Sequence, residues 1–122
     1  MPTVRYLVTD VEKALRFYRD QLGFAVTQQW GTTFAMVEKD GLVLWLSGPE
    51  TSAARPMPDG SRPEPGGWNR IVVEEDDLPA TVERLKAAGV RFRNEIITGP
   101  GGSQILAEDG VGNVVELFEA RA

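Results

Sequence analysis

The sequence of 122 residues contains no histidine and no cysteine. Without these side chains the protein has neither a histidine nor a thiolate ligand for a metal, and it has no disulfide. The lack of cysteine is also typical of cytoplasmic proteins, in which thiols stay reduced, so we expect a cytoplasmic location. Any function must then depend on carboxylates, arginines, hydroxyls, amides and aromatic rings.

Positive charge is scarce and scattered along the chain. Ten arginines and three lysines stand among 18 acidic residues, which gives a formal net charge of −5 and no basic cluster. This balance argues against nucleic acid as a partner. No apolar stretch reaches the length of a membrane span, so we expect no membrane partner either. The length favours a single domain, residues 1–122, which can bury a core without disulfides.

The first half of the chain is predicted to form a strand, a helix and three further strands. Residues 4–8 are rich in strand-forming side chains, Asp10 stands where a helix N-cap is expected, and Gly23 follows as a left-handed cap. The helix is predicted from apolar residues at helical spacing, which are Val11, Ala14, Leu15, Tyr18 and Leu22. The three further strands are expected at residues 24–30, 33–38 and 42–47.

The second half repeats this plan. Asp77 is again an N-cap, Gly89 again ends the helix, and the apolar stripe matches the first one with an offset of 67 residues, since Asp10 aligns with Asp77. The helix stripe consists of Leu78, Val82, Leu85 and Ala88. The strands are expected at residues 68–75, 91–97, 103–108 and 113–119.

The repeat predicts an α+β fold of two tandem βαβββ modules. We assign module one to residues 1–47, a linker or flap rich in proline and glycine to residues 48–67, and module two to residues 68–122. The helix of each module can cover only one face of its sheet. Residues 42–46 are continuously apolar, so the other face must also be covered, by the other module, a partner chain or a ligand. Cover by a partner chain would make the protein a homodimer, which we expect.

Two motifs resemble those of the vicinal-oxygen-chelate superfamily of glyoxalases, bleomycin-resistance proteins and extradiol dioxygenases. The first is Val-Thr-Asp-Val at residues 8–11 with Phe-Tyr-Arg-Asp-Gln-Leu-Gly-Phe at residues 17–24, and the second is Gly-Asn-Val-Val-Glu-Leu at residues 112–117. The resemblance covers nearly the whole chain. It implies that the two modules form a U-shaped mixed sheet around a cavity, which holds a divalent metal in the enzymes of the family.

The metal ligands that the resemblance implies are almost all missing. The family's positions correspond to Thr3, to Leu44 or Trp45, to Arg70 and to Glu116, of which only Glu116 can bind a cation. We therefore expect no metal and no cofactor. Arg70 is expected near the vacant metal position, in contact with Glu116. Alternatively, the two residues form an ion pair with a purely structural role.

Alternation along the strands predicts which residues line the cavity, because every second residue shares a face. Arg5 then accompanies Thr3, Trp68 accompanies Arg70, and Phe118 accompanies Glu116. Trp45 fits core packing as well as the cavity wall. The complete set of predicted ligand-binding residues is Thr3, Arg5, Trp30, Phe34, Met36, Trp45, Trp68, Arg70, Glu116 and Phe118.

This pocket of aromatic walls and a few polar anchors suits a flat or partly apolar small molecule. The favoured function is metal-independent binding of an aromatic or amphipathic compound, of the sequestration type that bleomycin-resistance proteins represent. The alternative is a lyase, isomerase or dioxygenase in which Glu116 is catalytic, with an oxygen-ligated divalent metal or by acid/base chemistry. A third possibility is a structural or regulatory dimer whose cavity is filled by its own side chains.

Overall fold

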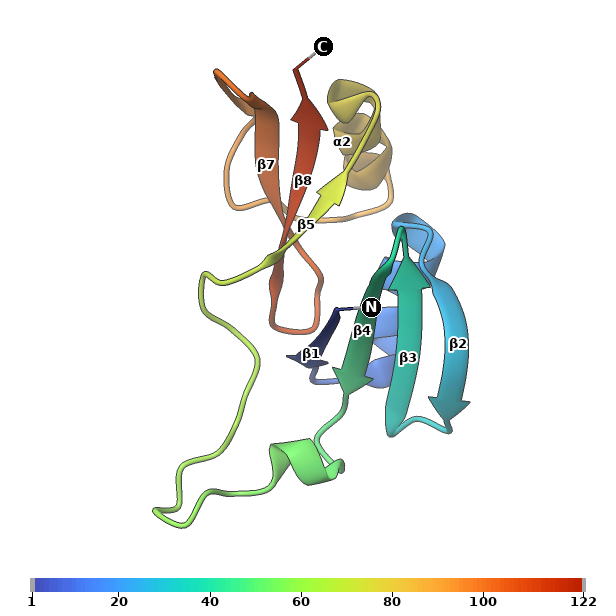
Figure 1. Ribbon diagram of the computed structural model, residues 1–122, viewed down its shortest axis with the longest axis vertical. Coiled ribbons are helices and arrows are strands. Elements are labelled where there is room, and N and C mark those ends of the chain that lie inside the picture. Colours follow the sequence, from blue (N-terminus) through green and yellow to red (C-terminus); the bar gives the residue numbers. More distant parts are fainter. Residues whose placement is uncertain (1, 122) are drawn as a thin grey trace. The chain divides into compact units, whose positions relative to one another are not determined.

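The computed structural model describes residues 2–121, which divide into two compact units with the boundary between Gly66 and Gly67. Each unit contains one four-stranded mixed sheet. A helical segment lies against the strands of each unit, as Figure 1 shows. This arrangement confirms the α+β fold of two βαβββ modules. The residues 48–66 of the predicted linker belong to the first unit. The prediction that the two sheets form one U-shaped sheet around a cavity remains a prediction.

The first unit follows the predicted order of elements. Its strands and helical segments are β1 (Thr3–Leu7), α1 (Val11–Leu15), η1 (Arg16–Gln21), β2 (Ala25–Trp30), β3 (Phe34–Lys39), β4 (Leu42–Ser47) and the short 3₁₀ turn η2 (Ser52–Ala54). The sheet order is β1-β4-β3-β2, in which β1 runs parallel to β4 and the other pairs are antiparallel.

The predicted helix of the first unit begins as expected but changes its geometry. Asp10 caps α1 by accepting a hydrogen bond from the backbone N–H of Lys13 at 3.0 Å. From Arg16 onward the segment η1 is a π-helix, in which Leu22 donates to the carbonyl of Phe17 at 3.1 Å. The wider turn lets Phe17 and its sequence neighbour Tyr18 both enter the core. The helix predicted between Asp10 and Gly23 is therefore present, with Gly23 at a φ of 81°, but its second half is a π-helix instead of an α-helix.

The second unit has the same topology, which confirms the repeat. Its elements are β5 (Ile71–Glu74), α2 (Leu78–Ala87), β6 (Ile97–Gly99), β7 (Gly102–Glu108) and β8 (Val114–Ala120). The sheet order is β5-β8-β7-β6, with β5 parallel to β8. Asp77 caps α2 by accepting from the N–H of Ala80 at 3.1 Å, as predicted.

The strand predicted at residues 91–97 is interrupted. Phe92 pairs with Ala107, and the next pair along the two chains is Ile97 with Gln104. The chain therefore advances by five residues from Phe92 to Ile97 while β7 advances by only three. Between these two pairs the side-chain oxygen of Asn94 accepts the N–H of Leu106 at 2.9 Å, which replaces a backbone ladder bond. The resulting bulge leaves only Ile97–Gly99 as β6. The strand predicted at residues 68–75 is also shorter, because it starts at Ile71.

One face of each sheet packs on its helix and holds the core. In the first sheet the buried residues of the central strands are Ala35, Val37, Leu44 and Leu46, and in the second they include Ile71, Val73, Ile105, Ala107, Val115 and Leu117. The intervening residues point to the opposite face, which no helix of the same unit covers. Within residues 2–121, no helix combines the length and the apolar character that crossing a membrane requires.

Candidate functional site

The open face of the first sheet carries six of the predicted ligand-binding residues, which are Thr3, Arg5, Trp30, Phe34, Met36 and Trp45. Strand register pairs Arg5 with Trp45 and Met36 with Trp45, so these three side chains share one face. The same register pairs Trp30 with Phe34 at the edge of that face. The sequence left open which face of strands 24–30, 33–38 and 42–47 these residues occupy, and the register settles it. Trp45 lies opposite the helix, so the expectation that it packs in the core of this unit was wrong.

These side chains form a continuous row, which we call the aromatic row and define as Trp30, Phe34 and Trp45. The ring centroids of Trp30 and Phe34 are 5.4 Å apart, and those of Phe34 and Trp45 are 6.1 Å apart. The guanidinium of Arg5 extends the row, since it lies 4.9 Å from the ring of Trp45. Trp30 keeps 52% of its surface exposed, so the row offers free aromatic area to a ligand.

Arg5 is held in place by a second contact. Its Nη1 donates a hydrogen bond to Oγ of Ser47 at 3.0 Å, and that hydroxyl donates to the carbonyl of Trp45 at 3.2 Å. Sequence analysis did not single out Ser47, because a serine at a strand end has no distinctive pattern. Thr3 shares the open face, but it pairs with Val43 and lies at the other end of β1 from Ser47.

On the second sheet, Arg70 contacts Glu116 as predicted. Nε and Nη2 of Arg70 donate to the same carboxylate oxygen, Oε1, at 3.1 and 2.8 Å. Glu116 lies on β8 opposite Val72 and keeps only 10% of its side chain exposed, against 29% for Arg70. Arg70 Nη1 also donates to the carbonyl of Trp68 at 3.3 Å. Among the hydrogen bonds of the described residues, none reaches Oε2 of Glu116.

Trp68 belongs to a second cluster that the sequence did not reveal in full. The ring of Trp68 is 66% exposed, and the guanidinium of Arg93 lies 4.8 Å from its centroid. Arg93 also donates to Glu108 at 3.3 Å and to the carbonyl of Gly67 at 3.3 Å. Arg93 was missed because it stands in the interrupted segment after α2, where strand alternation does not apply. Phe118 lies on β8 beside Gln104, on the same face as Glu116.

The residues at the family's metal positions do not fit a divalent cation. The only acidic side chain among them, Glu116, directs Oε1 at a guanidinium, which would repel a cation bound there. In the part of the chain that the structure describes, no three acidic, histidine or cysteine side chains gather in a way that could hold a metal. No chemical step through a metal is therefore derived for this chain.

Comparison with known families identifies the class of protein. The model of the glyoxalase/bleomycin resistance protein/dioxygenase superfamily matches residues 1–117. The chain therefore belongs to this superfamily, as the two sequence motifs indicated. No curated protein matches the chain significantly.

Solved structures support this fold at full length. A glyoxalase/bleomycin resistance protein/dioxygenase superfamily member from Sphaerobacter thermophilus is 27% identical, with a TM-score of 0.73 over 96% of this chain and 94% of that one. An antibiotic-binding protein from a Streptomyces species is 26% identical, with a TM-score of 0.73 over 98% and 93% of the two chains. A lactoylglutathione lyase from Agrobacterium tumefaciens is 20% identical, with a TM-score of 0.76 over 98% and 92%, which shows a shared fold alone.

Proposed function

We propose that this protein binds a small aromatic or amphipathic molecule on the open face of its first sheet and sequesters it without a resident metal. The observation that carries this proposal is the aromatic row beside Arg5, in which Trp30 is half exposed and Phe34 and Trp45 are partly exposed. Exposed aromatic surface in one continuous row is typical of binding sites and costly to leave in water.

The geometry favours a flat ligand with at least one polar group. Rings that meet edge to face leave part of their faces open for stacking, which contributes beyond the area buried. The guanidinium of Arg5 is already oriented by Ser47 and Trp45, so it can bind an acceptor with little loss of side-chain entropy. Met36 adds a flexible apolar side chain next to Trp45.

Trp68, Arg70, Glu116 and Phe118 of the second unit remain predicted ligand-binding residues. The antibiotic binding recorded for the Streptomyces relative agrees with a sequestration role for this chain. Pairing of two chains stays part of the proposal. It is supported by Val72 and Ile97 of the second sheet, which are 49% and 52% exposed.

Purified protein is expected to bind N-phenylnaphthylamine, an uncharged aromatic fluorophore, saturably at micromolar concentration. Binding should be unchanged after dialysis against EDTA, because no metal takes part. Fluorescence titration measures the affinity, and elemental analysis of the same sample measures bound metal. The absence of saturable binding to a folded sample would contradict the proposal, as would a stoichiometric metal whose removal abolishes binding.

The enzymatic alternative is acid/base chemistry through Glu116. It is favoured by one observation, that Arg70 fixes one oxygen of a nearly buried carboxylate while Oε2 has no hydrogen bond from the described residues. Some compounds found by titration could also be converted by the protein. For such a compound, Glu116→Gln should lower the turnover rate at least about a hundredfold and change the Kd of the compound by no more than a few-fold. NMR analysis of the products measures turnover. If the Glu116→Gln variant still converts the compound at the wild-type rate, Glu116 is not the acid/base residue.

A further inference from the structure

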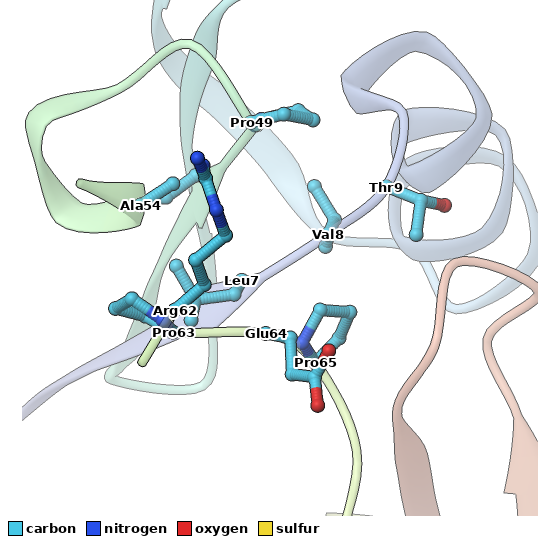
Figure 2. Close-up of a pocket in the computed structure, with 11 residues that line it drawn as sticks. Leu7, Val8, Thr9, Pro49, Ala54, Arg62, Pro63, Glu64 and Pro65 are labelled. Carbon is cyan, nitrogen blue, oxygen red and sulfur yellow. The ribbon is translucent and has the colours of Figure 1, made fainter. Parts of the chain in front are cut away.

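A pocket lies at the end of the first sheet where β1 and β4 finish and the proline-rich segment returns across them. Figure 2 shows this pocket, which has a volume of about 230 Å³. Its walls come from the ends of the two strands, from the turn η2 and from residues 62–65. All of these elements belong to the first unit.

The segment that closes the pocket is held by its own hydrogen bonds. The N–H of Met57 donates to the carbonyl of Ser61 at 2.7 Å, and that of Gly60 donates to the carbonyl of Met57 at 2.9 Å. Asp59 accepts from both the N–H and the hydroxyl of Ser61, and these bonds lower the pKa of Asp59. The tight turn directs the following residues, 62–65, back toward the strand ends.

The pocket adjoins the aromatic row. Its lining includes Ser47, which is only 1% exposed and whose neighbours on the open face are Leu7 on one side and Phe34 on the other. The hydroxyl of Ser47 also accepts the hydrogen bond from Arg5. A molecule that stacks on the aromatic row therefore has the pocket within reach of its substituents.

The volume of the pocket suits a substituent rather than a whole ligand. Sites for complete small molecules span roughly 300–1,000 Å³. A water molecule accounts for about 30 Å³ of liquid, so 230 Å³ corresponds to a group of modest size, such as a carboxylate or sulfonate with its nearest carbons.

Two charged side chains, Arg62 and Glu64, line the pocket. Arg62 extends its guanidinium between Pro49 and Ala54, while the carboxylate of Glu64 points to the opposite side (Figure 2). No hydrogen bond or ion pair joins Arg62 to any other described residue. A guanidinium carries a permanent charge and five N–H donors in a planar fork, which matches the oxygens of an anion.

We infer that this pocket is a subsite for an anionic substituent of the ligand, and that Arg62 is the residue that selects for it. The inference rests on the proposed function, because it assumes that the rest of the ligand stacks on the aromatic row. The ligand class is then narrowed to small aromatic molecules that carry a carboxylate, sulfonate or phosphate group.

A matched pair of probes tests the inference. Anilinonaphthalenesulfonate has the ring system of N-phenylnaphthylamine with an added sulfonate. The wild-type protein should bind the sulfonated probe more tightly, and Arg62→Gln should weaken that binding about tenfold, as expected for a charge-assisted hydrogen bond that is partly exposed. Binding of the uncharged probe should change less than twofold. Arg62→Lys should retain part of the preference, because it keeps the charge without the planar fork.

The matched control is Arg16→Gln, which removes the same charge from an exposed position on η1 and should leave both affinities unchanged. Equal effects of the two substitutions would overturn the inference, since they would reflect net charge alone. If the uncharged probe binds but Arg62→Gln leaves sulfonate binding intact, the inference fails and the proposed function stands. If neither probe binds the wild-type protein, both fail.

Discussion

Replacing Trp45 by alanine is expected to weaken the binding of N-phenylnaphthylamine about thirtyfold, the typical cost of truncating a central aromatic contact. Trp45 connects the aromatic row to Arg5, because Phe34 contacts its ring and the guanidinium of Arg5 lies 4.9 Å from the ring centroid. Alanine at this position removes the stacking surface and also the ring that orients Arg5. Fluorescence titration of both proteins gives the ratio of Kd values.

Two further variants separate the loss of a binding surface from a general effect on folding. Trp45→Phe keeps an aromatic face and should cost less than about fivefold in affinity. Met57→Ala removes an apolar side chain that is 45% exposed in the segment after β4 and should have no effect. If Trp45→Ala stays folded, as judged by circular dichroism and cooperative urea unfolding, and still binds as tightly as the wild type, the first sheet is not the binding face.

Which residues of a single strand share a face could be predicted from the sequence, because alternation along a strand is a geometric necessity. This alternation placed Arg5 beside Thr3 on the first strand and Phe118 beside Glu116 on the last one. It could not place Phe34 and Trp45 on the same face as Arg5, because that depends on the register between strands. The pairing of Arg70 with Glu116 was predicted from the family's metal positions, since both residues stand at such positions, and the structure shows the contact.

Other features could not be predicted, because no periodic pattern encodes them. The π-helical turn depends on how Phe17 and Tyr18 pack in the core, and the bulge after α2 depends on a single side-chain hydrogen bond from Asn94. The pocket beside Arg62 arises where a proline-rich segment folds back on the sheet, and prolines exclude regular elements without specifying a path. These are tertiary effects that override or lie outside local propensity.

The Arg70–Glu116 pair leads to the second large expected effect, which concerns stability. Arg70→Met should lower the free energy of unfolding by about 2 kcal/mol, because it leaves the carboxylate of Glu116 nearly buried and without its partner. The estimate lies below the 3–5 kcal/mol typical of a fully buried pair, since Arg70 is 29% exposed and solvent screens part of the interaction. Urea unfolding followed by circular dichroism measures the change.

The double variant Arg70→Met with Glu116→Leu should recover at least half of that loss, because it removes the stranded charge together with its partner. The matched single control is Arg93→Met. Its partner Glu108 is 43% exposed at a longer distance of 3.3 Å, so this change should cost less than about 1 kcal/mol. If the double variant is less stable than Arg70→Met alone, the destabilisation does not come from an unpaired carboxylate. Glu116 would then stabilise the second sheet through packing. The idea that the guanidinium of Arg70 neutralises Glu116 at the family's metal position would be contradicted.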